Sequence, residues 1–361
     1  MTTPAKKKLL IVDDSAFMRK MISDFFEGHE KIEVVGIARN GQDALKKIDL
    51  LQPDVLTMDI EMPEMDGLQA LKILMEKKPL PVIMLSSMTK AGADATLLAM
   101  EYGAFDFVGK PSGTISLDLH KVRDELVKKV MAGAEATVSN LKSTDWSGKE
   151  PLKTKIPTVP DPKRPIPFKK GQKKLIVIGT STGGPRALQA VLTKMPATTD
   201  APILIVQHMP PGFTKSLAER LNQLCAIEVK EAEHGEIVRQ GTAYIAPGGY
   251  HMKVKSIGTT LTIYLDEEEP PRGGHRPSVD VLFESVSITG KDLIAVIMTG
   301  MGADGTKGLR QMKRNKNVIA IAESQQTCIV YGMPKSAIES NLVDDIEDLD
   351  HISETIIKYL T

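Results

Sequence analysis

The sequence predicts an α/β fold of two doubly wound, mainly parallel-sheet domains, the second with an antiparallel insertion. Short apolar runs alternate with amphipathic stretches in both halves, as expected for parallel sheets covered by helices. A proline- and lysine-rich segment interrupts this alternation at residues 132–172. The 361-residue length also exceeds that of most single hydrophobic cores. We therefore expect domains at residues 1–131 and 173–361, joined by a flexible linker at 132–172.

The first half contains five apolar runs that read as buried strands. They lie at residues 9–12, 34–38, 55–58, 82–85 and 105–108. Between them, apolar residues recur at helical spacing, for example Phe17, Met21 and Phe25. A last helix is expected at about residues 117–131. This order of elements predicts a parallel sheet with helices on its faces.

The second half repeats the alternation and adds a different pattern. Buried strands are expected at residues 175–178, 203–206, 293–298 and 318–322. In residues 242–246, 252–255 and 261–265, apolar and polar residues alternate between turn signals. Because that alternation is typical of strands with one solvated face, these three segments predict the antiparallel insertion.

Composition excludes several classes of protein. The 46 basic and 46 acidic residues balance, which gives no electrostatic footprint of a nucleic-acid binder. Cys225 and Cys328 form neither a disulfide framework nor a metal-binding spacing, so a reducing cytoplasm is expected. No apolar run approaches the length of a bilayer span, and residues 1–8 lack the apolar core of a signal peptide. Direct membrane insertion is therefore not expected.

Polar residues follow four strands of the first sheet. Asp13 and Asp14 follow the first strand, Asp59 the third, Ser86 the fourth and Lys110 the fifth. Because the carboxyl ends of parallel strands meet at one edge, these side chains should converge. Mg²⁺ would relieve the repulsion among three carboxylates, and Lys110 and Ser86 could bind a phosphoryl group accepted by Asp59. The alternative is that the carboxylates only cap helices.

These residues closely resemble those of two-component receiver domains, over the whole first unit. The matching motifs are Ile11-Val12-Asp13-Asp14-Ser15, Met58-Asp59, Met62-Pro63-Glu64-Met65-Asp66-Gly67 and Lys110-Pro111. The resemblance implies that a histidine kinase phosphorylates Asp59, with the metal at Asp13, Asp14 and Asp59. It also implies that Ser86 and Phe107 act as switch residues together with Lys110, and that the Lys110-Pro111 bond is cis.

A hydrolytic site is predicted at the edge of the second sheet. Ser181 follows the strand at 175–178 in a G-x-S-x-G turn, the spacing of a strand–turn–helix nucleophile. His208 follows the strand at 203–206, and Asp304 follows the strand at 293–298. A serine nucleophile needs a base within reach and a group that orients the base. Glycines around Met301 would let backbone N–H groups approach an oxyanion.

Each of these residues has a plainer interpretation. Ser181 could be a helix N-cap, and His208 could be a loop histidine with a structural role. Rivals for the base and the acid are His234, His251, His275 and Asp280. The order Ser–His–Asp also differs from the Ser–Asp–His order of α/β-hydrolases, so the turn does not establish that fold.

Two other functions compete with hydrolysis. Residues 300–305 spell G-x-G-x-x-G after a strand, and the next strand ends before the acidic Glu323, which is a dinucleotide-binding fingerprint. Against it, the motif lies late in the unit, leaves little chain for a second mononucleotide half and does not explain the turn at Ser181. The second unit could also be an inactive docking domain under receiver control.

Four motifs of the second unit are similar to those of the chemotaxis protein-glutamate methylesterase family. They are Gly179-Thr180-Ser181-Thr182-Gly183-Gly184-Pro185, Gln207-His208-Met209, Gly274-His275-Arg276-Pro277-Ser278-Val279-Asp280 and Thr299-Gly300-Met301-Gly302-Ala303-Asp304-Gly305. With the receiver half, the resemblance spans essentially the whole chain outside the linker. It implies a Ser181–His208–Asp304 triad, with the Met301 N–H holding the oxyanion. His275 and Arg276 would lie near the substrate cleft.

The resemblance implies a phosphorylation-activated serine hydrolase for sensory adaptation in chemotaxis. The enzyme would demethylate glutamate methyl esters on chemoreceptors, releasing methanol, and would deamidate specific glutamines. Mg²⁺ would be needed for receiver phosphorylation, and no cofactor for ester hydrolysis. The expected partners are the methylated cytoplasmic domains of chemoreceptors and the histidine kinase of the pathway.

Overall fold

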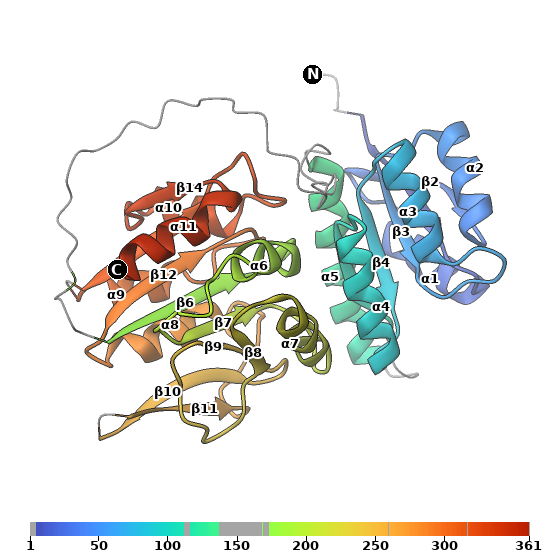
Figure 1. The fold of residues 1–361 in the computed structure, drawn as a ribbon. Coiled ribbons are helices and arrows are strands. Elements are labelled where there is room, and N and C mark those ends of the chain that lie inside the picture. Colours follow the sequence, from blue (N-terminus) through green and yellow to red (C-terminus); the bar gives the residue numbers. More distant parts are fainter. Residues whose placement is uncertain are drawn as a thin grey trace.

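The computed structural model describes residues 5–111, 116–136, 168, 173–258, 260–315 and 317–360. They form two α/β units, coloured blue to teal and green to red in Figure 1. Each unit has a parallel sheet covered by helices, and a small antiparallel sheet adjoins the second. The predicted fold class is therefore confirmed. Most of the predicted linker at 132–172 lies outside the described residues.

The first unit has a five-stranded parallel sheet in the order β2-β1-β3-β4-β5. Its strands are β1 (Lys7–Val12), β2 (Ile32–Ala38), β3 (Val55–Asp59), β4 (Val82–Ser86) and β5 (Asp106–Gly109). Its helices are α1 (Ala16–Phe25), α2 (Gly41–Leu51), α3 (Gly67–Lys77), α4 (Lys90–Glu101) and α5 (Ser116–Glu135). All five strands overlap their predicted ranges, and α5 continues four residues beyond the predicted end at 131.

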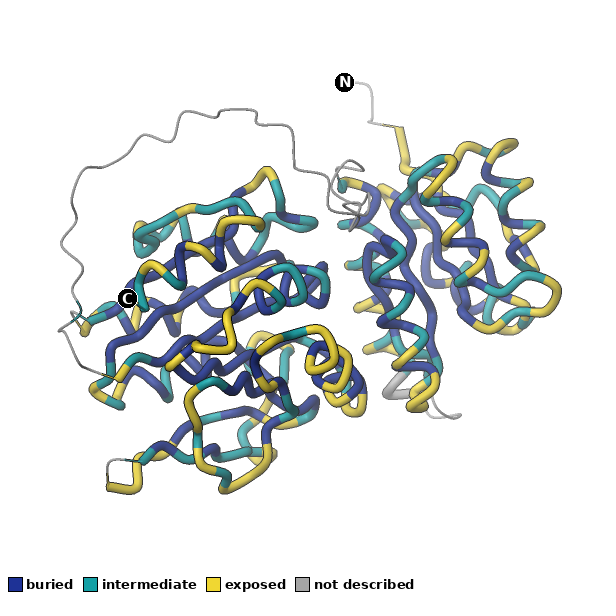
Figure 2. Tube along the Cα trace, in the orientation of Figure 1, coloured by how far each residue is buried: buried dark blue, intermediate teal, exposed yellow. Residues whose placement is uncertain are grey.

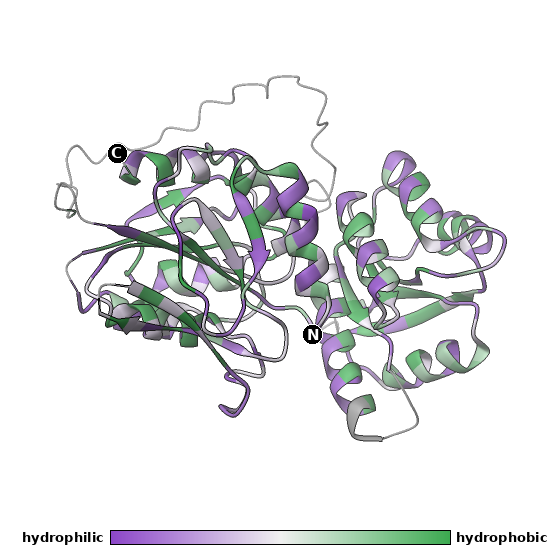
Figure 3. Ribbon diagram, turned by 60° about the horizontal axis from the view of Figure 1, so that its bottom comes forward, coloured by the Kyte–Doolittle hydropathy of each residue, from purple (hydrophilic) through white to green (hydrophobic). Residues whose placement is uncertain are grey.

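Local sequence explains where these helices begin. The side chains of Ser15, Asn40, Asp66 and Thr89 each accept a hydrogen bond from a backbone N–H in the first turn of the helix that follows. Such caps satisfy donors that a helix leaves unpaired at its start. The helices turn apolar residues toward the sheet, in which β3 and β4 are buried throughout and the edge strand β2 is partly exposed (Figure 2). Along the helices, hydrophobic and hydrophilic residues alternate (Figure 3).

The second unit has a seven-stranded sheet in the order β14-β13-β12-β6-β7-β9-β8, in which all neighbours pair in parallel. Its strands are β6 (Lys174–Thr180), β7 (Ile203–Gln207), β8 (Glu228–Glu231), β9 (Thr242–Ile245), β12 (Asp292–Ile297), β13 (Val318–Glu323) and β14 (Asp345–Glu347). Its helices are α6 (Gly184–Leu192), α7 (Phe213–Leu224), α8 (Val279–Ser287), α9 (Thr306–Met312), α10 (Met333–Glu339) and α11 (Leu349–Leu360).

The antiparallel insertion is smaller than predicted. Strands β10 (His251–Ile257) and β11 (Thr260–Asp266) pair antiparallel, as expected. The prediction that residues 242–246 belong to it is wrong, because β9 pairs in parallel with both β7 and β8. All four residues of β9 are buried, which is the pattern of a central parallel strand. The polar tip of Tyr244 disguises this pattern, and its hydroxyl is satisfied by Arg239 N and Ile237 O.

Two further expectations concern local geometry and membranes. A cis bond was expected at Lys110-Pro111, whereas the cis peptide bond in the described part of the chain is Arg276-Pro277. Among the described helices, none is long and apolar enough to cross a membrane.

Gly67 shows how tightly the first unit is built around Asp59. A Cβ atom at Gly67 would lie 2.0 Å from the backbone oxygen of Asp59. We predict that Gly67→Ala lowers the free energy of unfolding of the first unit by about 1–3 kcal/mol, because the backbone must shift.

Urea unfolding followed by far-UV circular dichroism measures this loss. Glu76→Ala, at an exposed position on the same helix, should stay within about 0.5 kcal/mol of wild type. Equal stability of Gly67→Ala and wild type would contradict the prediction.

Candidate active site

Ser181 lies in a sharp turn between β6 and α6. Its N–H donates to Thr299 O over 3.0 Å, and the side chain is only 9% exposed. The turn needs glycine at two positions. Gly183 has φ +79°, and a Cβ at Gly184 would lie 1.8 Å from Gln207 Oε1. The glycine-rich sequence therefore lets the serine sit directly against the strand ends of its neighbours.

His208 and Asp304 come from two other strand ends and form a hydrogen bond. His208 follows β7, Asp304 follows β12, and His208 Nε2 lies 2.8 Å from Asp304 Oδ2. Because a carboxylate only accepts hydrogen bonds, Nε2 carries the proton and Nδ1 keeps a lone pair. Nδ1 is buried and has no hydrogen-bond partner within the described residues. The base and its orienting acid are thus paired, while no hydrogen bond joins the base to Ser181 there.

Asp304 is held by the start of helix α8. Its Oδ1 accepts hydrogen bonds from Ser278 Oγ at 2.9 Å and Asp280 N at 3.0 Å, and its Oδ2 accepts one from Val279 N at 2.7 Å. Burial alone would raise the pKa of Asp304, but His208 and these N–H groups outweigh it and hold that pKa well below its usual range. Asp304 is therefore ionised and fixed in place.

Asp280, the rival acid, has a different set of partners. Its Oδ1 accepts hydrogen bonds from Gly305 N at 2.9 Å and Gly308 N at 2.7 Å, at the start of α9. It thereby supports the loop that carries Asp304. The structure brings Asp304, and not Asp280, to His208.

Of the three rival histidines, two have other hydrogen-bond partners and one stacks on His208. The Nδ1 of His234 faces Leu265 O, and the Nε2 of His251 faces Pro270 O. His275, in contrast, stacks on His208 with ring centroids 3.9 Å apart and planes 3° apart. Burial and the neighbouring His208 lower the pKa of His275 to about 4, so it is neutral at pH 7. His275 therefore covers the base without placing a charge against it.

The loop after β12 passes beside the serine. A Cβ at Gly300 would lie 2.7 Å from Ser181 Cβ and 2.5 Å from Met333 Sδ. Gly302 has φ +80°, and the N–H of the intervening Met301 makes no hydrogen bond within the described residues. The space beside Gly300 that a pyrophosphate would need is filled, which argues against the dinucleotide interpretation. The position of Met301 leaves its N–H available to an oxyanion.

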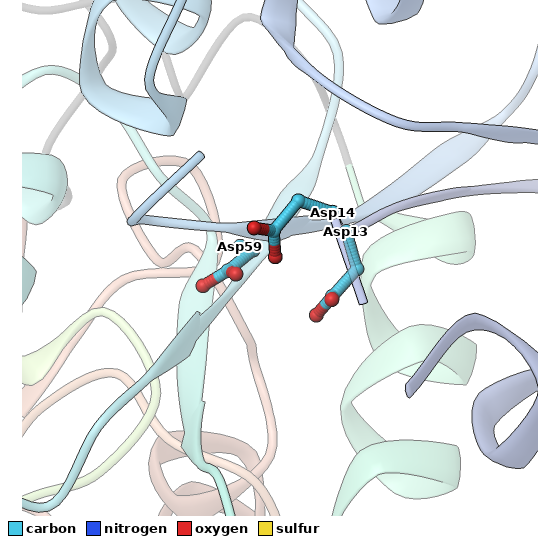
Figure 4. A group of neighbouring side chains, drawn as sticks. All are labelled: Asp13, Asp14 and Asp59. Carbon is cyan, nitrogen blue, oxygen red and sulfur yellow. The ribbon is translucent and has the colours of Figure 1, made fainter. Parts of the chain in front are cut away.

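An acidic pocket lies at the sheet edge of the first unit. Asp13, Asp14 and Asp59 offer carboxylate oxygens within 4.8 Å of one another (Figure 4). Lys110 Nζ lies 2.6 Å from Asp59 Oδ2 and 3.3 Å from Asp13 Oδ2. Burial raises the pKa of Asp59 to about 6, although Lys110 opposes this shift. Several carboxylates with one open side are the ligand set that Mg²⁺ takes in phosphoryl-transfer sites, so these residues fit that ion.

Two of the three expected switch residues, Ser86 and Phe107, face away from this pocket. Ser86 Oγ donates to Gly92 O on α4 over 3.0 Å. The ring of Phe107 stacks on Phe213 of α7, with centroids 4.9 Å apart and planes 10° apart. Phe107 therefore lies at the interface with the second unit.

This interface reaches the residue next to Ser181. Thr182 Oγ1 donates to Asp106 Oδ2 over 2.5 Å, and Asp106 is the neighbour of Phe107. Farther along, α4 packs on α6 and α7 (Figure 1), where Arg220 binds Glu101 through two hydrogen bonds of 2.8 and 3.1 Å. The sequence does not predict these contacts, since no motif marks a pairing between the two units.

Comparisons with known proteins identify a family for each of the two units. The sequence profile of the response regulator receiver domain matches residues 9–120, and that of the CheB methylesterase matches residues 176–356. The chain belongs to the CheB methylesterase family. A relative from Halalkalibacterium halodurans, named protein-glutamate methylesterase/protein-glutamine glutaminase, is 58% identical over 353 residues and covers 97% of each chain. One of the same name from Bacillus subtilis is 49% identical over 350 residues, again with 97% of each chain covered.

A solved structure resembles the catalytic half of this CheB family member. The CheB methylesterase catalytic domain of Thermotoga maritima is 45% identical, with a TM-score of 0.50. The match covers 52% of this chain and 98% of that chain.

The raised pKa of Asp59 predicts a pH-dependent effect of its removal. Because the folded-state pKa of about 6 lies above the ordinary 3.8, the folded protein holds this proton more tightly. The stability from the neutral carboxyl is present at low pH and is lost as the pH rises through about 6. Asp59→Asn should therefore stabilise the receiver increasingly from pH 4.5 to about 6.5, by at most about 3 kcal/mol, and the gain should then level off.

Urea unfolding at several pH values, with a chelator present, measures this gain. Asp49→Asn, at an exposed position of α2, is the control and should show no gain that grows with pH. A gain from Asp59→Asn that does not grow between pH 4.5 and about 6.5 would contradict a raised pKa.

Proposed function

We propose that this CheB family member is a phosphorylation-activated serine hydrolase that demethylates glutamate methyl esters, and deamidates specific glutamines, on chemoreceptors. The observation that carries the proposal is the His208–Asp304 hydrogen bond, made at the sheet edge that also bears Ser181. Relatives named protein-glutamate methylesterase/protein-glutamine glutaminase, similar over nearly the whole chain, support the substrate class.

In the proposed reaction, Ser181 Oγ attacks the γ-carbonyl carbon of the methylated glutamate while His208 Nδ1 takes the hydroxyl proton. Asp304 stabilises the imidazolium that forms. The Met301 N–H donates to the oxyanion of the tetrahedral intermediate, a contact worth about 2.7–4 kcal/mol of barrier in other serine hydrolases. The imidazolium returns its proton to the methoxy oxygen, and methanol leaves.

Water then resolves the acyl-enzyme. His208 takes a proton from the water, whose oxygen attacks the acyl carbon, and Ser181 leaves as the alcohol. With a glutamine substrate, the same steps release ammonia in place of methanol. Both reactions end in a glutamate, and neither needs a metal in the roles assigned to these residues.

The first unit is proposed to receive a phosphoryl group from a histidine kinase on Asp59. Asp13, Asp14 and Asp59 would hold Mg²⁺, which neutralises phosphoryl charge when bound. Lys110 binds a phosphoryl oxygen from the other side. We assign the receiver to residues 1–131, the linker to 132–172 and the catalytic domain to 173–361, in the cytoplasm with the receptor domains that it modifies.

Control is proposed to pass through the interface beside Ser181. When Ser86 turns from Gly92 toward the phosphoryl group, it vacates space near α4 and lets Phe107 leave Phe213. That movement weakens the neighbouring Asp106–Thr182 hydrogen bond, so the units separate and the cleft opens to a receptor helix. The stacked rings and this hydrogen bond support the arrangement because both involve β5 residues of the receiver.

The function is tested by methanol release from methylated receptor membranes, with and without a small phosphodonor and Mg²⁺. Ser181→Ala should lose at least about 10⁴-fold in rate, because no other group can form the acyl-enzyme. Asp59→Asn should keep the basal rate and lose the stimulation. A fluorophosphonate probe should label wild type and not Ser181→Ala.

No methanol release from wild type under any condition would refute the methylesterase proposal. If the probe also failed to label the protein, a catalytically inactive docking domain would be the better interpretation. Release that persists in Ser181→Ala would refute the assigned nucleophile.

The interface makes a separate prediction about basal activity. Glu101→Arg and Arg220→Glu should each raise methanol release without phosphodonor about two- to fivefold, since like charges weaken the closed state by no more than about 1 kcal/mol. The double variant should restore the low basal rate, as it re-forms the pair in reverse.

The matched control reverses an ion pair away from the interface. Lys20 Nζ lies 2.7 Å from Asp24 Oδ1 on α1, and reversing either charge should leave the basal rate unchanged. Two results would contradict an inhibitory interface. One is a wild-type basal rate in both single variants, and the other is a basal rate that stays high in the double variant.

A further inference from the structure

Glu323 is a buried carboxylate that the proposed reaction does not use. It ends β13, at the same sheet edge as Ser181, and is 0% exposed. Its Oε2 accepts a hydrogen bond from Thr299 N over 2.8 Å, and its Oε1 accepts one from Thr327 Oγ1 over 3.0 Å. Both carboxylate oxygens therefore accept hydrogen bonds from loops that leave the sheet edge.

Thr299 connects Glu323 to the nucleophile. Thr299 O accepts the hydrogen bond from Ser181 N over 3.0 Å, and Thr299 Oγ1 donates to Thr182 O over 2.9 Å. Thr299 is also the residue from which the Gly300–Met301 loop departs. One backbone unit thus sets the position of Ser181 and of the N–H that is to hold the oxyanion.

The burial of this carboxylate is unfavourable by itself. Desolvation raises the pKa of Glu323 to about 7, against the hydrogen bonds from Thr299 and Thr327. The other residues of β13 are Val, Ile and Ala, and an apolar residue at its end would avoid the desolvation of a carboxylate. An apolar residue would, however, leave the Thr299 N–H buried without an acceptor.

We propose that Glu323 is a positioning residue for the esterase reaction, whose carboxylate fixes Thr299 and thereby sets the distance between Ser181 and the Met301 N–H. This inference rests on the proposed function. Displacing a group in an active site by about 1 Å costs on the order of 100-fold in rate. The effect falls on kcat, because the oxyanion contact exists only after the serine has attacked.

The test compares Glu323→Leu, Glu323→Ala and Glu323→Gln in the full-length protein, with methanol release from methylated receptor membranes as the readout. Leu and Ala remove the acceptor and should lower kcat on the order of 10- to 100-fold with KM within about twofold of wild type. Gln keeps an acceptor for Thr299 N and an amide for Thr327 Oγ1, so its kcat should remain within about threefold of wild type.

The matched controls are Glu347→Leu and Glu347→Gln. Glu347 is the register partner of Glu323 on β14, and its Oε1 accepts a hydrogen bond from Thr355 Oγ1 over 3.0 Å, away from the Thr299 loop. Both controls should keep the wild-type kcat. Thermal melts establish which variants are folded at the assay temperature, and if Glu323→Leu is not, the Ala and Gln variants decide.

The possible results separate the two proposals. If wild type releases methanol through Ser181 and folded Glu323→Leu or Glu323→Ala does so with wild-type kcat, the positioning role is wrong and the function stands. A kcat for Glu323→Gln as low as that of Glu323→Ala also overturns it, because the acceptor would then not be what matters. Absence of wild-type activity overturns the function itself.

Discussion

Neighbouring strands of a parallel sheet run in one direction, so the loops that follow them all leave from the same edge. That constraint assembles both sites of this protein from residues far apart in the chain. In the second unit it brings the turn at Ser181, the base His208 and the loop of Asp304 together, although 96 residues separate the last two. In the first unit it gathers Asp13, Asp59 and Lys110. Each strand contributes one or two polar residues, and the hydrophobic sheet behind them supplies the rigidity.

The second constraint is close backbone approach. Glycine at positions 184 and 300 allows the loops after β6, β7 and β12 to approach one another closely, because no side chain stands between them. Gly67 does the same beside Asp59. Backbone N–H groups then stabilise the charged side chains, as at the start of α8, where two of them donate to the ionised Asp304. The chemistry thus depends on these glycines, which carry no side chain, as much as on the polar side chains of the sites.

The sequence predicted the strands of the first sheet and β6, β7, β12 and β13 of the second, because continuous apolar runs mark strands that are buried on both faces. It also placed Ser181, His208 and Asp304 at one edge through the parallel-sheet rule, and their catalytic roles stay predictions. It failed at β9, where Tyr244 made a central strand look half-solvated. It could not show that Ser86 turns to Gly92, or that Asp106 meets Thr182, because such contacts are decided by packing between distant segments. A buried acid such as Glu323 also has no motif, and only its contacts reveal it.

The contact between Asp106 and Thr182 has a consequence for the direction of signalling. Two sites that share an interface are thermodynamically coupled, and coupling of binding equilibria is reciprocal. If a phosphoryl group at Asp59 favours separated units, then a receptor helix that occupies the cleft and keeps the units apart must favour the phosphorylated receiver by the same free energy. The receptor would therefore act on its own modifying enzyme as an allosteric effector and shift that enzyme toward its active form.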